Sequence, residues 1–314
     1  MLSRTADHVY WLGRYAERAE NLARTLDVQY RLSLLPQAVR TDSAGWSRML
    51  TTLGLDAAYA HRHDVLEPMR AIEFLAFDRG NPSSILSCLW HARENARAVR
   101  GSISSEMWET FNSTWLEARS GPASRRGPHD VAEFVDWVKY RAHLARGVVL
   151  GSMLRDEGYH FMQLGTFLER ADGVVRMMLA QLGRADDGPG ADDRDHYAWG
   201  ALLRALSAFE IYRRVTRHPA TPLNVVAFAT FRPDVPRSVL RSAALIYENL
   251  GAVANAASAE TERRAGVLHA RLRFGAPDSL AIDGLEPSLR SILATTGDIA
   301  VRIGRDFLGH GTPA

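Results

Sequence analysis

One pattern of ten residues occurs twice in this 314-residue chain, and no other feature of the sequence limits the available folds as strongly. Residues 12–21 align without gaps with residues 164–173, 152 positions later, and both copies contain Leu-Gly followed by Glu-Arg-Ala and an acidic residue. A second match, of residues 74–86 with residues 228–240, follows at an offset of 154. Two collinear matches predict a duplicated helical unit of about 150 residues, with halves at 1–150 and 151–314 related by a pseudo-two-fold axis.

Apolar residues recur at helical spacing through almost the whole chain. The predicted helices span residues 3–33, 85–99, 131–154, 159–182, 196–214, 222–231, 237–257, 262–274 and 287–308. Asn81-Pro82 is typical of an N-cap followed by proline in the first turn of a helix. A stretch rich in Gly, Pro and Asp predicts a flexible acidic linker at 183–195. The sequence therefore predicts an all-α fold, a large helical bundle that forms one domain over 1–314.

The composition excludes several classes of protein. Hydrophobic residues make up 46% of the chain and charged residues 24%, which is typical of a globular protein with a sizeable core. A formal charge of +2 is too balanced for a protein that coats nucleic acid or an anionic membrane, so neither is an expected partner. The N-terminus lacks an apolar leader segment, and no apolar run approaches the ~18 residues of a membrane span. These features, with a single cysteine, favour a cytoplasmic protein.

The repeated motif places polar side chains on one side of each of two helices. Arg14, Glu17, Asn21 and Arg24 lie at spacings of three and four residues, so their side chains can meet. One interpretation is a solvated face with weak ion pairs; the other is a polar centre where the two helices face each other. The recurrence favours the centre, either a buried ion-pair lock or a functional cleft, and Gly13 and Gly165 would allow close approach. The candidate binding residues are Arg14, Glu17, Arg18, Glu20, Asn21, Arg24, Glu169, Arg170 and Asp172.

A further polar cluster follows the first predicted repeat segment. Arg93, Glu94, Asn95 and Arg97 lie within one predicted helix, where the arginines would form a basic ridge. Such a ridge can bind phosphate or carboxylate groups, because guanidinium groups pair with both in a bidentate manner. The alternative is a charged surface stripe.

These segments together resemble the alpha-E family, bacterial all-helical proteins named for a Glu-Arg motif. The resemblance covers essentially the whole chain and rests on residues 10–15, 17–21, 92–97, 168–172 and 236–238. It adds Arg237 to the candidate binding residues. It implies partnership with circularly permuted ATP-grasp ligases and transglutaminase-like proteins in the synthesis or modification of peptides. It leaves the mechanism open, because it brings no established catalytic activity for the helical domain itself.

The motifs of several common chemistries are missing. Glu157 and His160 have the spacing of a di-iron site, but a second Glu-x-x-His is lacking, so we expect no metal. The chain has neither a phosphate-binding loop nor a Gly-x-Ser-x-Gly nucleophile motif, and we expect no cofactor.

Two hypotheses about function remain. The first is a helical partner or binding protein of an ATP-grasp ligase system that binds a peptide or an anionic small molecule through the Glu-Arg surface. The second is an acyl- or aminoacyl-transfer enzyme in which Glu17 or Glu169 acts as general base and arginines hold an anionic substrate. The missing nucleophile favours the first. A cavity lined by both motifs would favour the second, and a flat surface the first.

Overall fold

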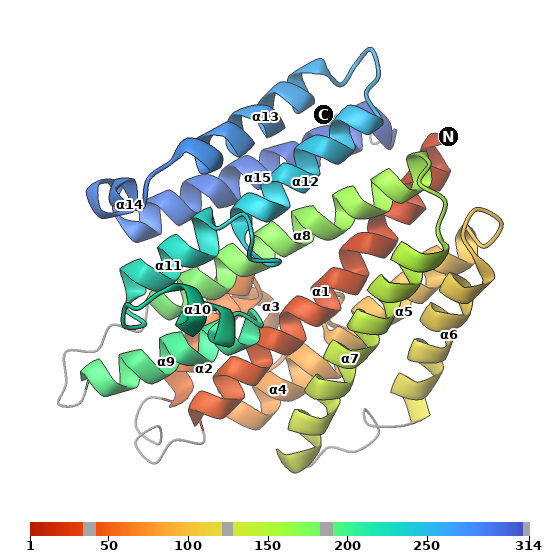
Figure 1. Ribbon diagram of the computed structural model, residues 1–314. Coiled ribbons are helices and arrows are strands. Elements are labelled where there is room, and N and C mark those ends of the chain that lie inside the picture. The colour runs from red at the N-terminus through yellow and green to blue at the C-terminus, as the bar shows by residue number, and fades with distance from the viewer. Residues whose placement is uncertain (34–41, 121–127, 183–190, 310–314) are drawn as a thin grey trace.

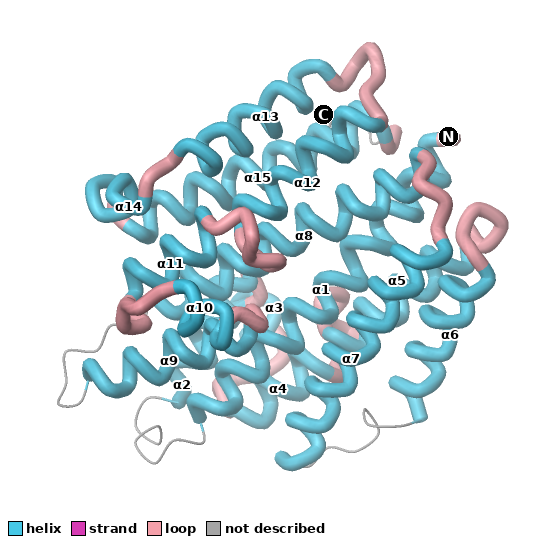
Figure 2. Tube along the Cα trace, viewed as in Figure 1, coloured by secondary structure: helices cyan, strands magenta, loops and turns pink. Residues whose placement is uncertain are grey.

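The computed structural model describes residues 1–33, 42–120, 128–182 and 191–309, and all its regular elements within these residues are helices (Figures 1 and 2). The helices of the first part of the chain are α1 (Ser3–Ser33), α2 (Asp42–Leu53), α3 (Asp56–Ala60), α4 (Pro68–Ala76), α5 (Ile85–Ala98), α6 (Ser105–Ser120) and α7 (Pro128–Ser152). Those of the second part are α8 (Glu157–Leu182), α9 (Ala191–Ala205), α10 (Phe209–Val215), α11 (Pro222–Phe231), α12 (Val239–Ala252), α13 (Ala259–Phe274), α14 (Pro277–Asp283) and α15 (Leu285–Phe307). The predicted all-α fold is confirmed.

The two motif helices, α1 and α8, lie side by side at the centre of the molecule (Figure 1). Residues of α1 contact residues of α8 in rising order, Gly13 next to Thr166 and Asn21 next to Gly173, so the two helices run parallel. Other helices surround α1. As a result, both its apolar residues and its polar residues pack against protein.

Two glycines mark the closest approach of this central pair. A methyl group on Gly13 would lie 2.3 Å from the carbonyl oxygen of Met162, and one on Gly165 would lie 2.1 Å from that of Tyr10. Both distances are far below van der Waals contact, so the two backbones touch only because neither position has a side chain.

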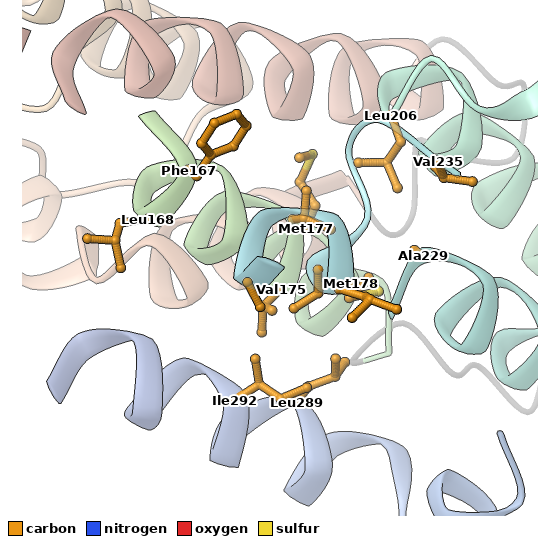
Figure 3. Packing of buried hydrophobic residues seen from close by; sticks show 14 of the residues in the cluster. Phe167, Leu168, Val175, Met177, Met178, Leu206, Ala229, Val235, Leu289 and Ile292 are labelled. Atoms are coloured by element: carbon orange, nitrogen blue, oxygen red, sulfur yellow. The ribbon is translucent and has the colours of Figure 1, made fainter. Parts of the chain in front are cut away.

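Apolar cores fill the space on either side of α1 and α8. One core joins α8 to the helices that follow it; Figure 3 shows Val175 and Met178 of α8 beside Leu289 and Ile292 of α15. The other cores join α1 to α2, α4, α5, α6 and α7. The central helix pair therefore lies between the cores, and its polar side chains have little access to water. Among the described helices, none is long and apolar enough to cross a membrane.

Two pairs of helices, each with one member before α8 and one after it, have equal lengths, and one of these pairs also has matching N-caps. α5 and α12 each contain 14 residues, and α6 and α13 each contain 16. Ser84 and Ser238 are the N-caps of α5 and α12, and each hydroxyl accepts from the amide three residues later. The ring nitrogen Nδ1 of His8 lies 2.9 Å from Asn95 Oδ1, and that of His160 lies 2.8 Å from Asn249 Oδ1.

Three local expectations differ from the structure. Asn81 does not cap α5. Its side-chain nitrogen Nδ2 donates to the carbonyl of Phe74, and its side-chain oxygen Oδ1 accepts from the backbone amide of Ser83. Ser84 provides the cap instead. The predicted helix 196–214 is two helices, because Ser207 adopts a φ of 53° between α9 and α10. Of the predicted linker 183–195, residues 183–190 lie outside the described residues and residues 191–195 belong to α9.

Candidate functional site

Three buried glutamates lie along the central helix pair, and each is held by at least two arginines. Glu17 and Glu20 of α1 are 2% and 0% exposed, and Glu169 of α8 is 6% exposed. We call the cluster that they form with their partners the Glu–Arg network. Its members are Arg14, Glu17, Arg18, Glu20, Asn21, Arg24, Arg146, Glu169, Arg170 and Arg237.

Glu17 joins α1 to α8 and to the turn before α12. Arg170 donates from Nε and Nη2 to the two carboxylate oxygens at 3.0 and 2.8 Å, and Arg237 Nη2 donates at 2.6 Å. Burial by itself would raise the pKa of Glu17, but the positive charges of Arg170 and Arg237 outweigh it and lower the pKa. The interpretation of this motif position as a solvated surface residue is wrong, because surrounding helices cover it.

Glu20 receives arginines from α1, α7 and the turn before α12. Arg24, one turn later, donates to Oε1 at 2.9 and 2.7 Å, and Arg237 Nη1 donates to the same oxygen at 3.0 Å. Arg146 of α7 donates to both oxygens. Burial opposes the ionised form, yet the positive charges hold the pKa of Glu20 well below its usual range.

Glu169 accepts the corresponding fork from α1. Arg18 donates from Nε and Nη2 at 2.6 and 3.0 Å, and Arg14 Nε donates at 2.6 Å. The backbone carbonyl of Glu169 accepts from Asn21 Nδ2 at 2.9 Å. Burial would raise the pKa of Glu169, but the charges of Arg14 and Arg18 dominate and lower it to about 2. Each motif glutamate is thus paired with the motif arginine of the other helix.

The Glu–Arg network carries more positive than negative charge. It contains six arginines and three glutamates, a formal charge of +3. The carbonyl of Ala205 at the end of α9 accepts from Arg24 Nη1 at 2.5 Å and offsets a part of this excess. Burial lowers the pKa of Arg237 to about 10, although Glu17 and Glu20 counteract the effect. The excess charge lies on Arg14, Arg18 and Arg146, whose side chains are 14%, 27% and 30% exposed, and it favours the binding of an anionic group.

A cavity of about 270 Å³ opens beside the α8 part of the network and is lined by both copies of the motif. Its charged and amide side chains are Arg14, Arg18, Asn21, Glu169, Asp172 and Arg176. The apolar side chains of Leu22, Leu53 and Leu55 form part of the wall. Within the described residues, Arg14 Nη2 and Arg18 Nη1 have no hydrogen-bond partner, so both remain available to a ligand.

A second cavity, of about 190 Å³, lies on the other side of the network, against α7. Glu17, Glu20, Arg146 and Arg170 reach it, but most of its wall consists of apolar side chains of α6, α7 and α8. It offers fewer groups that could hold a charged ligand than the first cavity does.

The structure leaves one predicted cluster apart from the network. Arg93 and Arg97 pair with Glu94, and the Arg93 guanidinium lies over the ring of Trp108 at 5.4 Å. Asn95 contacts His8 and the carbonyl of His91 instead. These four residues form a local surface arrangement on α5. The described residues contain no group of three His, Cys, Asp or Glu side chains that could hold a metal ion.

Sequence reasoning missed two residues of the site. Arg146 belongs to neither copy of the motif, and nothing in its spacing distinguishes it from other arginines of α7. Ser83 lines the first cavity and aligns with Arg237 at the offset of 154. The repeat alignment could have identified Ser83 as a site residue, because it pairs this small residue with Arg237, a predicted binding residue.

The state of the carboxylates limits the chemistry of the site. A general base works best when its pKa lies near the working pH. The pKa of Glu169 is about 2 and that of Glu17 is lowered, and the forks of Arg18 and Arg170 occupy both oxygens of each. Both glutamates are therefore poor proton acceptors at neutral pH. Their geometry instead allows them to hold arginine side chains in fixed positions.

The lowered pKa of Glu169 predicts a loss of stability in acid. A carboxyl with a folded pKa of about 2 and an ordinary value of 4.5 stabilises the fold fully above pH 4.5, and this contribution disappears as the pH falls from 4.5 towards 2. The full contribution is on the order of 3 kcal/mol, of which about 2 kcal/mol should be lost between pH 6 and pH 3. Urea unfolding at pH 6 and pH 3 measures it. Glu169→Gln, which has no proton to gain, should lose less stability between these pH values than the wild type; an equal loss in both would contradict the assignment.

Comparison with known proteins gives a family but no characterised relative. The sequence model of Alpha-E, described as a predicted alpha-helical domain with a conserved ER motif, matches residues 1–308. An uncharacterized protein of Mycobacterium bovis is 26% identical over 311 residues, which is 93% of this chain and 35% of that protein. An uncharacterized protein of Mycobacterium tuberculosis is 25% identical over the same extent. The chain thus spans about a third of the length of these relatives. No solved structure matches it.

Proposed function

The chain belongs to the Alpha-E family, and from this premise we propose that it is a helical binding partner of an ATP-grasp ligase in a peptide-synthesis or peptide-modification system. In this proposal the Glu–Arg network holds arginine side chains in place, and the cavity of about 270 Å³ receives a peptide or another anionic small molecule. A transglutaminase-like protein is the second proposed partner. Because an ATP-grasp ligase consumes ATP, the proposal also favours a cytoplasmic location.

The observation that carries this proposal is the cavity lined by both copies of the motif. Arg14 and Arg18 line this cavity, and each uses part of its guanidinium group to bind Glu169 while one of its nitrogens has no hydrogen-bond partner among the described residues. A guanidinium that is fixed in this way loses little side-chain entropy when it binds a carboxylate or phosphate. The site is therefore prepared for an anionic group before any ligand arrives.

A cavity of this kind was the feature expected of the alternative, a transfer enzyme with Glu17 or Glu169 as general base. The binding role suits the site better, because both glutamates have lowered pKa values and are held by arginines. The part of the alternative that remains attractive is the holding of an anionic substrate by arginines.

The length of the relatives is compatible with a fused or multidomain arrangement. The matched region is 35% of each mycobacterial protein, so the rest of those chains has room for further domains. The family resemblance implies such a connection to ATP-grasp ligases. We propose that the present helical domain acts next to a ligase, in the same complex or the same chain.

We also infer that the chain arose by duplication and that a pseudo-two-fold axis runs along the α1–α8 pair. Reciprocal contacts support this inference, since Glu17 binds Arg170 while Glu169 binds Arg18. A second correspondence joins more distant helices. Arg24 donates to a carbonyl at the end of α9, and Arg176 donates to the carbonyl of Thr52 near the end of α2.

Binding measurements with purified proteins test the proposed function. The chain should form a complex with the ATP-grasp ligase encoded beside it, detected by light scattering after size-exclusion chromatography. Calorimetric titration with the ligase's peptide product should give saturable binding that Arg18→Gln weakens at least about tenfold, because a charge-assisted hydrogen bond is lost. Arg290→Gln, at an exposed pair on α15, is the control and should bind normally. Absence of both the complex and peptide binding would reject the proposal.

A further inference from the structure

The two halves of the chain differ at two positions beside the motif glutamates. In the second match of the repeat, Ser83 corresponds to Arg237. The first match pairs Asn21 with Gly173. Arg237 and Asn21 fill the space around Glu17 and Glu20, whereas Ser83 and Gly173 line the open cavity beside Glu169. A part of the cavity is thus the place that a long arginine side chain fills in the other half, where the second cavity, of about 190 Å³, also borders Glu17 and Glu20.

The contacts of Arg237 indicate which chemical group can bind at the equivalent position in the cavity. Its guanidinium donates from Nη1 to Glu20 at 3.0 Å, and from Nη2 to Glu17 and to Asn21 Oδ1, both at 2.6 Å. By the repeat alignment, the carboxylates that correspond to Glu17 and Glu20 are Glu169 and Asp172. Both of them line the cavity.

These two carboxylates, which both line the cavity, retain acceptor capacity. Glu169 Oε1 accepts one hydrogen bond, from Arg18 Nε. Asp172 Oδ1 has Arg176 Nη2 at 3.3 Å, and the main bond of this pair goes to Oδ2 at 2.6 Å. A carboxylate oxygen accommodates two acceptor interactions, so a cationic donor can bind at both. The Asp172 side chain is 26% exposed, which leaves it within reach from the cavity.

The same cavity also offers groups of the opposite charge. Arg14 Nη2 and Arg18 Nη1 are available to an anion, and Leu53 at the end of α2 and Leu55 at the start of α3 provide an apolar surface. A ligand that satisfies the whole wall therefore carries a positive group, a negative group and an apolar part. A volume of about 270 Å³ is sufficient for a single amino acid or the end of a short peptide.

We propose that this cavity binds a zwitterionic ligand, an α-amino acid or the end of a short peptide. Its cationic nitrogen occupies the position equivalent to the Arg237 guanidinium, at Glu169 and Asp172. Its carboxylate binds Arg14 and Arg18, and its apolar side chain lies against Leu53 and Leu55. The inference rests on the proposed function, because it specifies the ligand of the same site.

Calorimetric titration with L-leucine and two blocked derivatives tests this ligand class. L-leucine should bind saturably, while leucinamide, which lacks the carboxylate, and N-acetyl-leucine, which lacks the cationic nitrogen, should each bind at least about tenfold more weakly. Equal binding of all three compounds, or no binding of leucine, would overturn the inference. If the ligase's peptide product still bound in an Arg18-dependent way, the proposed function would survive that failure.

Two variants connect the binding to the cavity. Ser83→Arg introduces the side chain that the other half has, so it should fill the cavity and abolish leucine binding. Asp172→Asn should weaken leucine binding at least about tenfold and leave the weak binding of N-acetyl-leucine unchanged, a result that remains informative if Ser83→Arg fails to fold. Ser120→Ala, at an exposed position at the end of α6, is the control. Leucine binding that persists in a folded Ser83→Arg variant, or in Asp172→Asn, would refute the assignment.

Discussion

Replacement of Glu17 by glutamine is expected to lower the free energy of unfolding by about 3–5 kcal/mol. The carboxylate is 2% exposed and balances the charges of Arg170 and Arg237, which are themselves buried. Glutamine keeps the volume of the side chain but removes the negative charge, so the excess positive charge of the network increases. Desolvated arginines without a counterion account for the size of the loss.

Urea unfolding monitored by circular dichroism measures this effect. The matched control is Glu286→Gln, because Glu286 forms an exposed pair with Arg290 in which both side chains are more than half exposed. Such a pair contributes less than about 1 kcal/mol. A loss of that small size in Glu17→Gln would show that the network does not stabilise the fold.

Replacement of Gly165 by alanine is expected to destabilise the fold by about 3 kcal/mol or more. The added methyl group would lie 2.1 Å from the carbonyl oxygen of Tyr10, which is backbone and cannot rotate away. The central helices would have to separate, and the hydrogen bonds of Arg14 and Arg18 to Glu169 would lengthen. Intrinsic helix propensity acts in the opposite direction, since alanine is favoured over glycine by about 1 kcal/mol in a helix.

A second glycine separates these two effects. Gly147 lies within α7, five residues before its last residue, is exposed, and has nothing near the position of an added methyl group. Gly147→Ala should therefore raise the free energy of unfolding by about 0.5–1 kcal/mol. Thermal and urea unfolding of both variants provide the test. A Gly165→Ala variant as stable as Gly147→Ala would contradict the close approach of α1 and α8.

The sequence by itself determined the all-α class and most of the long helices, and it singled out the repeated motif; α2, α3, α4, α6 and α14 were not among the predicted helices. Periodicity predicted a helix at 3–33, as found for α1, and one at 159–182, close to α8 at Glu157–Leu182. These features follow from local spacing, because the hydrophobic periodicity of a helix depends only on the residues of that helix. The motif glycines also indicated close approach, because a glycine kept within a helix at a cost in stability usually has a packing reason.

Tertiary structure alone decided how the charges pair and where the cavity lies. Spacing allowed Glu17 to bind arginines within its own helix, but its partners are 153 and 220 residues away. Arg146 enters the network only because α7 packs against α1. The small residues Ser83 and Gly173 leave space in the wall of the cavity unfilled. This space is defined only when distant segments of the chain pack together. The physical reason is that a helical pattern is set by neighbours along the chain, whereas pairing of buried charges is set by which helices surround them.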